Sequence, residues 1–516
     1  MFLITSAAYI SPGLASEFGK LPPSMLPVQN RRLYEHQVAL IDEGEKVVLS
    51  LPQSYKPTRF DENKLASLKV RVIFVPDGLT LGQSIVYVLN VAGDYSQPLR
   101  ILHGDTLYSE IKNGVDVCAV ANAEDAYDWA LTGQHDNRVF SGYFSFSDQS
   151  LLIRKITEND YKFIKGVEDY AKQIKLTHIE MPNWMDFGLV NTYYRSISRL
   201  TTQRVFNSMI VSRYSVKKSS LDKRKMEAEA NWIESLPISM KHYVPEVWDK
   251  GEEDGRGYYE IEYYFLSSLA NLYVFGCNKA YVWKEIIDAC ASYLDDEVCF
   301  KPNDSEAVAA LNDKLYVDKT RVRIKEYAVQ TGISLEKEWT INGISVPSLN
   351  DIIAETGRMI TQQETRFATL MHGDPCFSNI LYDFKSKSIK LIDPRGIDNN
   401  GNISLWGDFR YDVAKLAHSV LGMYDFIIGG MYDYSEVSPY QVELRFEENE
   451  VVSDVQTYFQ SKVFGGYSLE ELSTYSILVH LFLSMLPLHS DHPERQKAML
   501  ANALRIYAKY IKQKES

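Results

Sequence analysis

The first half of the chain alternates short apolar runs with helical patterns, and this alternation restricts the folds available to it. Four runs have the character of buried strands: "MFLITSA", "KVVLSLP", "KVRVIFVP" and "LRILHGD". Between the last two, "LGQSIVYVLNVAG" places apolar residues at helical spacing. Strands that alternate with helices favour a parallel sheet, because the chain must cross back to the starting edge between two parallel strands and usually does so through a helix. We therefore predict an α/β domain with a mostly parallel sheet, to which "NRVFSGYFSFSD" adds a later strand.

The character of the sequence changes near residue 200. The chain has 516 residues, which is too many for one ordinary core. Beyond the change we expect an antiparallel pair, "RVFNSMIVSRYSVKKSS", a charged helix, "LDKRKMEAEANWIESLP", and a strand that leads into a helix, "GRGYYEIEYYFLSSLANL". Helical patterns dominate from about Tyr281. We predict an α/β domain over residues 1–197 and an α+β domain over residues 198–516, with a small sheet lobe and a large helical lobe.

Composition excludes several classes of function. The formal net charge is -13, which argues against nucleic acid as a partner, since phosphate backbones attract basic surfaces. No apolar run approaches the length of a membrane span, and the start of the chain lacks the basic residues of a signal peptide. Five scattered cysteines without CxxC spacing favour reduced thiols. We expect a cytoplasmic protein with neither nucleic-acid nor membrane partners, and its oligomeric state stays open.

The segment "MHGDPCFSNILYDFKSKSIKLIDPRG", residues 371–396, carries the clearest chemistry. Asp374 ends an apolar lead-in at a turn, where it can accept a proton from a substrate hydroxyl. Asn379 follows five residues later, and a predicted hairpin, "NILYD" to "IKLID", returns Asp393 to its side. A carboxylate and an amide oxygen are hard ligands that suit Mg²⁺ shared with phosphates. The spacing therefore indicates a magnesium nucleotide.

This segment resembles the aminoglycoside phosphotransferase and choline kinase family, which is related to the protein kinases. The resemblance implies that Asp374 is the catalytic base and that Asn379 and Asp393 are metal ligands. Further on, "WGDFRYDVAKLAHS" resembles the GDPxxDLA segment of that family, which implies structural roles for Asp408 and Asp412. ATP and Mg²⁺ are the implied cofactors.

A kinase also needs a lysine on a strand and a glutamate on a helix to pair with it. Lys218 is our choice for the lysine and Lys217 the alternative, since alternation places them on opposite faces of a strand. Glu229 is the chosen partner, and Glu227 is second. The strand "YYEIEYYFLSSL", with Glu262 in it, is expected to bind the adenine through its backbone. The sequence has no GxGxxG loop, which members of this family often lack.

The first half resembles the sugar-phosphate nucleotidyltransferases, which implies a Rossmann-like domain. "MLPVQNRRLYEHQV" follows part of their signature, and "LRILHGDTLYSEI" and "NWMDFGLVNTYYRSI" resemble the two segments that carry metal-binding aspartates. The resemblance implies that Asp105 and Asp186 hold Mg²⁺. It places three residues of "DGLTLGQSIVYVLN" against the nucleotide base, namely Gly82, Gln83 and Ser84.

The first half also departs from that family. The loop after the first strand, "TSAAYISPGLASEFGK", lacks the usual GxGxR pattern, and Pro23 stands where the family has a lysine. Lys20, Arg31 and Arg32 are the candidates to replace that charge. A catalytically inert domain that serves as a scaffold is the alternative interpretation.

Together the two halves predict a bifunctional enzyme. The kinase would phosphorylate a small hydroxylated compound, and the other domain would join that phosphate to a nucleotide from CTP or another NTP. Such products feed surface polysaccharide synthesis, including that of capsules. Sugars, polyols and amino alcohols all remain open as acceptors. The alternatives are a kinase with an inert partner domain and a binding protein built from two pseudo-enzymes.

Overall fold

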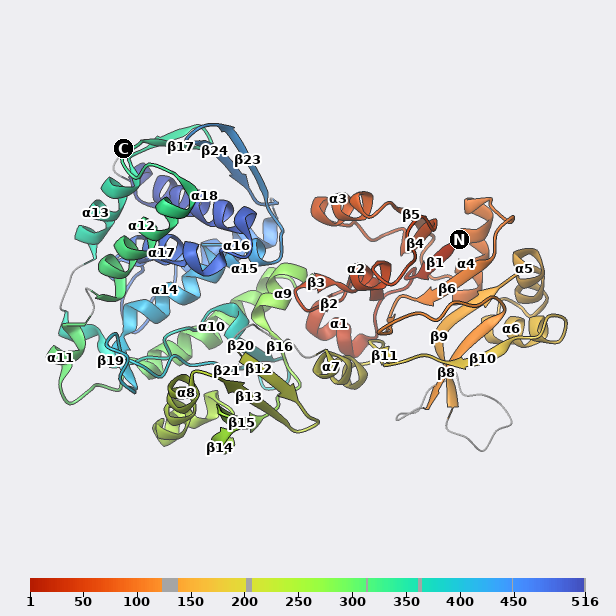
Figure 1. Ribbon diagram of the computed structural model, residues 1–516, viewed down its shortest axis with the longest axis horizontal. Helices are drawn as coiled ribbons and strands as arrows, with labels where there is room; N and C mark the ends of the chain where they lie inside the picture. The colour runs from red at the N-terminus through yellow and green to blue at the C-terminus, as the bar shows by residue number, and fades with distance from the viewer. Residues whose placement is uncertain (123–137, 201–206, 312–313, 361–363, 448, 515–516) are drawn as a thin grey trace. The chain divides into compact units, whose positions relative to one another are not determined.

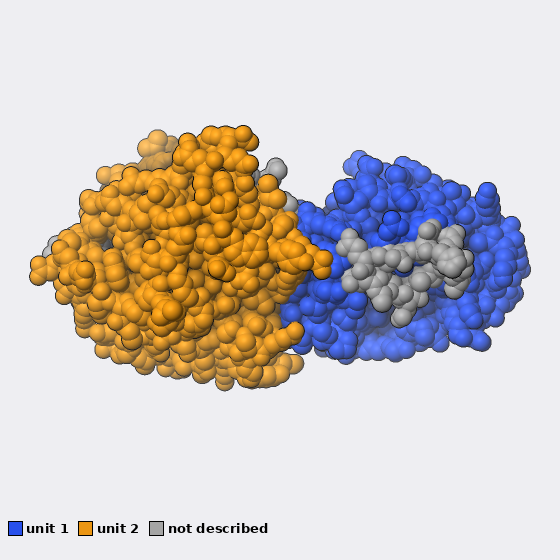
Figure 2. Space-filling view, turned by 90° about the horizontal axis from the view of Figure 1, so that it is seen from below, with its two compact units in different colours: residues 1–200, 275–277 blue, residues 201–274, 278–516 orange. Residues whose placement is uncertain are grey.

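A computed structural model describes residues 1–122, 138–200, 207–311, 314–360, 364–447 and 449–514. The chain forms two compact units, shown in separate colours in Figure 2. Unit 1 comprises Met1–Leu200 together with Phe275–Cys277, and unit 2 comprises Thr201–Val274 and Asn278–Ser516. Within the described residues, no helix is both long and apolar enough to cross a membrane.

Unit 1 is built on a seven-stranded mixed sheet, visible in Figure 1. In spatial order its strands are β10 (Thr177–Glu180), β8 (Val117–Asn122), β9 (Arg138–Phe146), β6 (Leu99–His103), β1 (Phe2–Thr5), β4 (Val47–Pro52) and β5 (Val70–Val75). All neighbours pair in parallel except those of β9, which is antiparallel to β6 and to β8. The α/β class predicted for this half is confirmed.

Helices accompany the strands of unit 1, as the crossovers require. They are α1 (Pro12–Phe18), α2 (Leu33–Val38), α3 (Arg59–Ser67), α4 (Leu81–Ala92), α5 (Gln149–Glu158), α6 (Phe163–Ala171) and α7 (Val190–Arg199). The start of α4 is fixed by a capping box between Thr80 and Gln83. The apolar face of α4, with Ile85, Val88 and Leu89, packs into the same core as strand residues of the sheet.

Two short ribbons complete unit 1. β2 (Pro27–Val28) pairs with β3 (Arg31–Arg32), and β7 (Thr106–Leu107) pairs with β11 (Met185–Asp186), antiparallel in both cases. The second ribbon joins segments that are far apart in the sequence. It directly follows the end of β6, so it lies at the carboxyl edge of that strand, where ligands bind in open α/β sheets.

Unit 2 begins with a four-stranded antiparallel sheet. Its order is β12 (Asn207–Val211), β13 (Ser215–Ser220), β15 (Arg256–Glu262) and β14 (Val247–Glu253). Helix α8 (Lys223–Ser235) starts at Asp222, whose side chain accepts the Lys225 amide, and it contacts β15. The 3₁₀ helix η2 (Ile238–Tyr243) follows it.

The rest of unit 2 is mainly helical. Its helices are α9 (Leu269–Phe275, whose last residue groups with unit 1), α10 (Ala280–Glu297), α11 (Ser305–Ala309), η3 (Lys314–Asp318), α12 (Lys319–Thr331), α13 (Leu349–Met359), α14 (Phe409–Val420), α15 (Tyr424–Ile428), α16 (Glu450–Gln460), α17 (Thr474–Met485) and α18 (Pro493–Tyr510). Helix α17 is buried from Thr474 to Ser484 and contacts α12, α13, α14 and α18, so it lies at the centre of this core.

Short strands interrupt these helices. The hairpin β20 (Ile380–Asp383) and β21 (Ser388–Leu391) pairs with β16 (Ser267–Ser268), and β19 (Ala368–Leu370) pairs with β22 (Trp406–Asp408). A further four-stranded sheet has the order β18 (Ile344–Val346), β17 (Trp339–Ile341), β24 (Gln441–Arg445) and β23 (Asp433–Ser438). The sequence patterns did not indicate this last sheet. Its pairing of β17 with β24 joins segments about a hundred residues apart, and three-residue strands give too weak a periodic signal.

Candidate active sites

Unit 2 contains a buried charge cluster centred on Lys218. Lys218, on β13, donates from Nζ to Glu229 Oε2 at 2.7 Å and to Asp393 Oδ1 at 3.0 Å. Tyr259, its neighbour on β15, donates to the same Glu229 oxygen at 2.8 Å. Burial lowers the pKa of Lys218, but Asp393 and Glu229 outweigh it and leave the pKa raised. The lysine therefore stays charged, and it joins the sheet and helix α8 to the segment after β21.

The two alternatives in this region lie outside the cluster. Lys217 points to the other face of β13, where it pairs with Glu253 and lies over the Tyr258 ring. Glu227 is exposed on α8, whereas Glu229 is buried. The alternation of β13 and the helical period of α8 thus select one residue of each pair for the interior.

The catalytic-loop candidates gather at the turn after β19. Asp374 follows Gly373, whose φ is +84°. Residues with a side chain rarely adopt this backbone conformation, so the position favours glycine. Its carboxylate is held by Lys415 of α14, with Nζ 2.8 Å from Oδ1. Oδ1 is buried, yet the side chain is 40% exposed, so the other face of the carboxylate is open. Burial acts to raise the pKa of Asp374, but Lys415 outweighs it and holds the pKa below its ordinary value.

Asn379 and Asp393 meet through the hairpin, as the sequence predicted from its length. The Ile392 amide donates to the carbonyl of Asn379 at 3.0 Å, which places Asp393 directly beside that residue. The Asn379 amide nitrogen donates to the Asp374 carbonyl at 3.0 Å. This bond holds the two ends of the loop together. The Asn379 amide oxygen accepts the Ser378 hydroxyl at 3.2 Å and keeps a second lone pair for another partner.

Two buried carboxylates, those of Asp412 and Asp408, stabilise the loop that carries Asp374 and the helix α14 that packs beside it. Asp412 accepts the amides of His372 at 2.6 Å and Gly373 at 2.8 Å, so it fixes the backbone that precedes Asp374. Asp408 caps α14 and forms a buried ion pair with Arg410 at 2.7 Å. The sequence resemblance assigned a structural role to both aspartates, and their contacts are of that kind.

Glu262 ends β15 without an amide free for a ligand. Its backbone N–H donates to the Glu246 carbonyl at 3.1 Å, and the next amide, that of Tyr263, donates to Tyr214 at 2.8 Å. The Glu262 side chain lines a hollow with Lys241, Tyr264 and Lys390, among others. In this arrangement the Glu262 amide cannot also bind an adenine, so such a contact would have to come from the segment that follows.

In unit 1, Asp105 and Asp186 converge. Asp186 on β11 pairs with Thr106 on β7, and the Phe187 amide donates to the Asp105 carbonyl at 2.8 Å. A Cβ placed on Gly188 would lie 3.0 Å from Oδ2 of Asp105 and 3.2 Å from Oδ1 of Asp186. Both carboxylates therefore border the same point, although their segments are far apart in the sequence.

The surroundings of this carboxylate pair are buried. Burial raises the pKa of Asp105 and lowers the pKa of His103, at the end of β6, to about 4. Gln37 of α2 is fully buried, and its amide donates to the carbonyls of His103 at 3.0 Å, Gly104 at 3.2 Å and Thr106 at 2.9 Å. One side chain thus fixes the turn that presents Asp105.

The three cations proposed to replace the missing lysine differ in availability. Arg32 is buried, pairs with Asp61 at 3.0 Å and donates to the Met25 carbonyl at 2.8 Å. It is a structural residue and is excluded as a phosphate ligand. Lys20 is exposed and lies 4.0 Å above the Tyr9 ring, and Arg31 is also exposed. Either of these two can reach a ligand, whereas Pro23 lies in the short helix η1 (Pro23–Met25).

The proposed base-binding residues occupy the first turn of α4. A Cβ on Gly82 would lie 2.2 Å from the Tyr161 carbonyl, so a glycine is needed for close packing. The Gln83 side chain accepts the Thr80 amide at 2.9 Å, and Ser84 is buried. The structure therefore gives Gly82 and Gln83 local structural roles, and any base contact would be an addition to them.

Three further residues at the sites were missed from sequence. They are Lys415, which holds Asp374, Gln37, which holds the Asp105 turn, and Arg395, which packs on Gly373. All three lie inside the sequence segments that resemble the two families, so their location in the chain could have marked them as candidates. Their partners were not readable, because each contact joins residues that only the tertiary fold brings together.

The oxygen ligands fit Mg²⁺ that is shared with a nucleotide. Mg²⁺ is usually held by one or two carboxylates and keeps its other positions for water and phosphate. In the part of the chain that the structure describes, no group of three or more His, Cys, Asp or Glu could hold a metal ion. Asn379 with Asp393, and Asp105 with Asp186, could supply two ligands each to a metal completed by phosphate oxygens.

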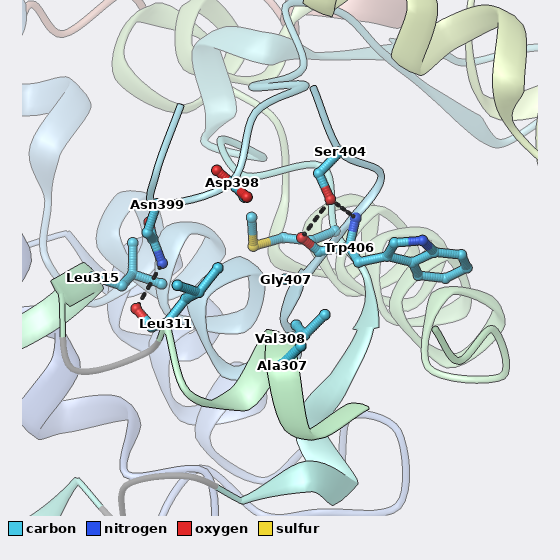
Figure 3. A pocket seen from close by; sticks show the side chains of 10 residues that line it. Ala307, Val308, Leu311, Leu315, Asp398, Asn399, Ser404, Trp406 and Gly407 are labelled. Atoms are coloured by element: carbon cyan, nitrogen blue, oxygen red, sulfur yellow. Dashed lines mark hydrogen bonds between the residues drawn. The ribbon is translucent and has the colours of Figure 1, made fainter. Parts of the chain in front are cut away.

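A pocket lined in part by Met371, which precedes the loop of Asp374, is shown in Figure 3. Its walls include Val308, Leu315 and Trp406, and polar atoms come from Asp398 and Asn399. The Asn399 side chain donates to the Leu311 carbonyl at 3.0 Å, as drawn in the figure, and its oxygen accepts from Arg395 Nη2 at 3.0 Å. The pocket thus borders the residues that follow Asp393.

No protein-family model matches the chain, and no curated protein matches it significantly. Solved structures do match. An aminoglycoside-3'-phosphotransferase of type VIII is 16% identical, with a TM-score of 0.30, over 53% of this chain and 86% of that one. A thermostable mutant of aminoglycoside phosphotransferase APH(4)-Ia is 12% identical, with a TM-score of 0.38, over 60% of this chain and 93% of that one. One structure of that mutant enzyme holds ADP and hygromycin B.

Another solved structure belongs to a different class of protein and matches a smaller part of this chain. A protein named as a glucose-1-phosphate thymidylyltransferase from Bacillus anthracis is 13% identical, with a TM-score of 0.29, over 38% of this chain and 94% of that one. The matches thus include an aminoglycoside phosphotransferase-like fold and a sugar-phosphate thymidylyltransferase-like fold, the two kinds of protein that the sequence resembles. At scores this low, no activity passes from these proteins to this chain.

Proposed function

We propose that this chain is a bifunctional enzyme that phosphorylates a small hydroxylated compound with ATP and then transfers a nucleotidyl group to the phosphate. The observation that carries the proposal is the contact of Lys218 with both Glu229 and Asp393, beside a loop that presents Asp374. A buried lysine shared by two carboxylates is costly unless it is needed. In a kinase, Lys218 would orient the phosphates of ATP.

The kinase step follows from the positions of these side chains. The open face of the Asp374 carboxylate accepts the proton of the acceptor hydroxyl, whose oxygen attacks the γ-phosphorus while ADP leaves. Lys218 neutralises charge on the α- and β-phosphates. Asn379 and Asp393 would hold Mg²⁺, which would neutralise charge on the phosphates when bound. Catalysis is then mostly positioning, for which Asp412 fixes the loop backbone.

The second step is assigned to unit 1. A phosphate oxygen of the first product attacks the α-phosphorus of a second NTP, CTP or another, and pyrophosphate leaves. Asp105 and Asp186 would hold Mg²⁺ at the edge of the sheet. What supports this step is their convergence at Gly188 in a buried setting, since two carboxylates so placed repel unless a cation lies between them. Lys20 or Arg31 would steady the NTP phosphates.

The product would be a nucleotide-activated building block. Compounds of that class supply surface polysaccharide synthesis, and we assign the chain to such a route, with a sugar, polyol or amino alcohol as the general class of acceptor. The two active units are the proposed domains, and the boundary falls near residues 197–198. We expect the reactions to take place in the cytoplasm, where ATP and NTPs are available.

Two assays test the proposal. Purified protein is incubated with ATP, Mg²⁺ and a panel of small alcohols, and phosphorylated products are identified by mass spectrometry. Each phosphorylated product is then offered with each NTP, and pyrophosphate release is measured. We expect one acceptor to pass through both steps. Phosphorylation without pyrophosphate release from any NTP would favour a kinase with an inert partner domain, and absence of both reactions would favour a binding protein.

A further inference from the structure

Positive charge gathers around Tyr411 of α14. Lys415 of α14 touches the Asp374 carboxylate, and Lys319, the first residue of α12, has its ammonium 5.8 Å from the Tyr411 ring centroid. Arg395 approaches from the segment after β21. Three cations from three separate segments of the chain thus act on Tyr411, and Lys415 and Arg395 contact Asp374 and the glycine before it, respectively.

Lys319 has no acidic partner. Among the residues that the structure describes, no carboxylate forms an ion pair with it, although its side chain is half-buried. Tyr411 acts to raise the pKa of Lys319, but burial and the neighbouring Arg323, Arg395 and Lys415 outweigh it and leave the pKa lowered. A cation in this setting is destabilised by its neighbours, so it would gain from an added anion.

Arg395 is pinned in place while part of its guanidinium stays unused. Its amide donates to the His372 carbonyl at 2.8 Å, and its Cβ lies where a side chain on Gly373 would be. Nη2 donates to Asn399 at 3.0 Å, whereas Nη1 is buried and has no hydrogen-bond partner among the residues that the structure describes. A buried guanidinium nitrogen without an acceptor is unfavourable, and an anion beside it would remove that cost.

The nearby groups confirm the sign of the local potential. Burial raises the pKa of Tyr411, but Lys319, Lys415 and Arg395 outweigh it and leave the pKa lowered. The opposing carboxyl is Asp425 of α15, which is buried, so that its pKa is raised to about 6, and no ion pair joins it to the cluster within the described residues. Of the carboxyl groups of Asp374 and Asp425, that of Asp374 is the one that forms an ion pair with a cation of the cluster, Lys415.

We infer that the acceptor of the proposed kinase carries an anionic group, a carboxylate or a phosphate, which Lys319 and Arg395 bind while its hydroxyl meets Asp374. This inference rests on the proposed kinase function and narrows its substrate class. Cationic acceptors such as amino alcohols would place like charges together and are disfavoured. The neutral members of the class would leave two cations unpaired.

Matched sets of acceptors test this directly. Each set keeps one carbon skeleton and varies only the charge, as in glucose, glucuronate and glucosamine, or glycerol, glycerate and 2-amino-1,3-propanediol. ATP consumption and product mass are measured with the full chain. We expect the anionic member of a set to give at least about a tenfold higher kcat/KM than the others, since a charge-assisted hydrogen bond is worth about that much. A preference for a neutral or cationic member would overturn the inference.

Lys319→Gln probes the cluster itself, and Lys325→Gln is its matched control on the exposed side of the same helix. We expect Lys319→Gln to raise the KM for the anionic acceptor about 10- to 100-fold and to erase the preference within the set. The KM for ATP should not change. If the KM for ATP rises instead, the cluster binds the phosphates of the nucleotide and the inference fails.

The outcomes also distinguish a failure of this inference from a failure of the proposed kinase function on which it rests. If the protein binds ATP but phosphorylates no anionic member of any set, the anionic acceptor is wrong while nucleotide binding by unit 2 stands. If ATP does not bind, as measured by calorimetry with Mg²⁺ present, the proposed kinase function itself is wrong. An equal loss of activity for every member of a set with Lys319→Gln would mark a structural role and would likewise overturn the inference.

Discussion

At the scale of single residues, Asp374 combines burial on one side with exposure on the other. Asp374→Asn keeps the size of the side chain and removes the proton acceptor. We expect kcat of the kinase to fall about a hundredfold to ten-thousandfold, the range of general-base contributions, with ATP binding retained. Steady-state kinetics and calorimetry measure the two effects. A near-normal rate would mean that another group faces the acceptor.

Lys415 determines the pH range over which Asp374 stays ionised. Asp374 acts as a carboxylate, and Lys415 holds its pKa below the ordinary value, so activity persists as the pH falls until the carboxylate is protonated. Lys415→Met removes the cation and leaves a partly buried carboxylate, whose pKa should rise. We expect the acid limb of the kinase pH–rate profile to move up by about one pH unit or more.

The matched control for this variant is Lys497→Met, which changes a partly exposed lysine on α18. Its profile should follow that of the wild type. An acid limb that stays in place with Lys415→Met, in a variant that still turns over at higher pH, would show that Asp374 does not set this limb.

At the scale of elements, the β7–β11 ribbon decides whether unit 1 can be an enzyme. Gly188 follows β11 and lies against both carboxylates, so Gly188→Ala would place a methyl group 3.0 Å from Asp105 and 3.2 Å from Asp186. Either the ribbon or the carboxylates must shift by a few tenths of an ångström. Since small misplacements of reacting groups can cost about a hundredfold, we expect pyrophosphate release to fall at least about tenfold.

Kinase activity is the internal control for this variant, since its site is built from other elements. Gly114→Ala is the external control, because the three atoms nearest to a Cβ there all belong to the Val117 side chain and none belongs to a carboxylate. Full nucleotidyl transfer by Gly188→Ala would argue that the space between Asp105 and Asp186 holds no reacting group.

At the scale of the whole molecule, the two sites belong to different units and share no residue. Asp393→Ala should abolish phosphorylation and spare pyrophosphate release from a phosphate made beforehand. Asp105→Ala should do the reverse. Both activities are measured on the same preparation of each variant, with circular dichroism as the check on folding. Loss of both activities in a folded single variant would contradict two independent sites.

Local signals were sufficient for some parts of this protein. The strand runs of unit 1, helix α4 and the hairpin that brings Asp393 to Asn379 all depend on neighbours a few residues away, so periodicity and turn residues predict them. The alternation of β13 likewise predicted that only one of Lys217 and Lys218 could face the interior, although not which.

Only the tertiary structure decided the remaining contacts. It selected Lys218 and Glu229, excluded Arg32 by burying it against Asp61, placed Asp105 and Asp186 around Gly188, and added the sheet of β17, β18, β23 and β24. It also gathered Lys319, Arg395 and Lys415 about Tyr411. These are contacts between segments distant in the chain. Their energy depends on burial and on charges supplied by other elements, which no local pattern of residues contains.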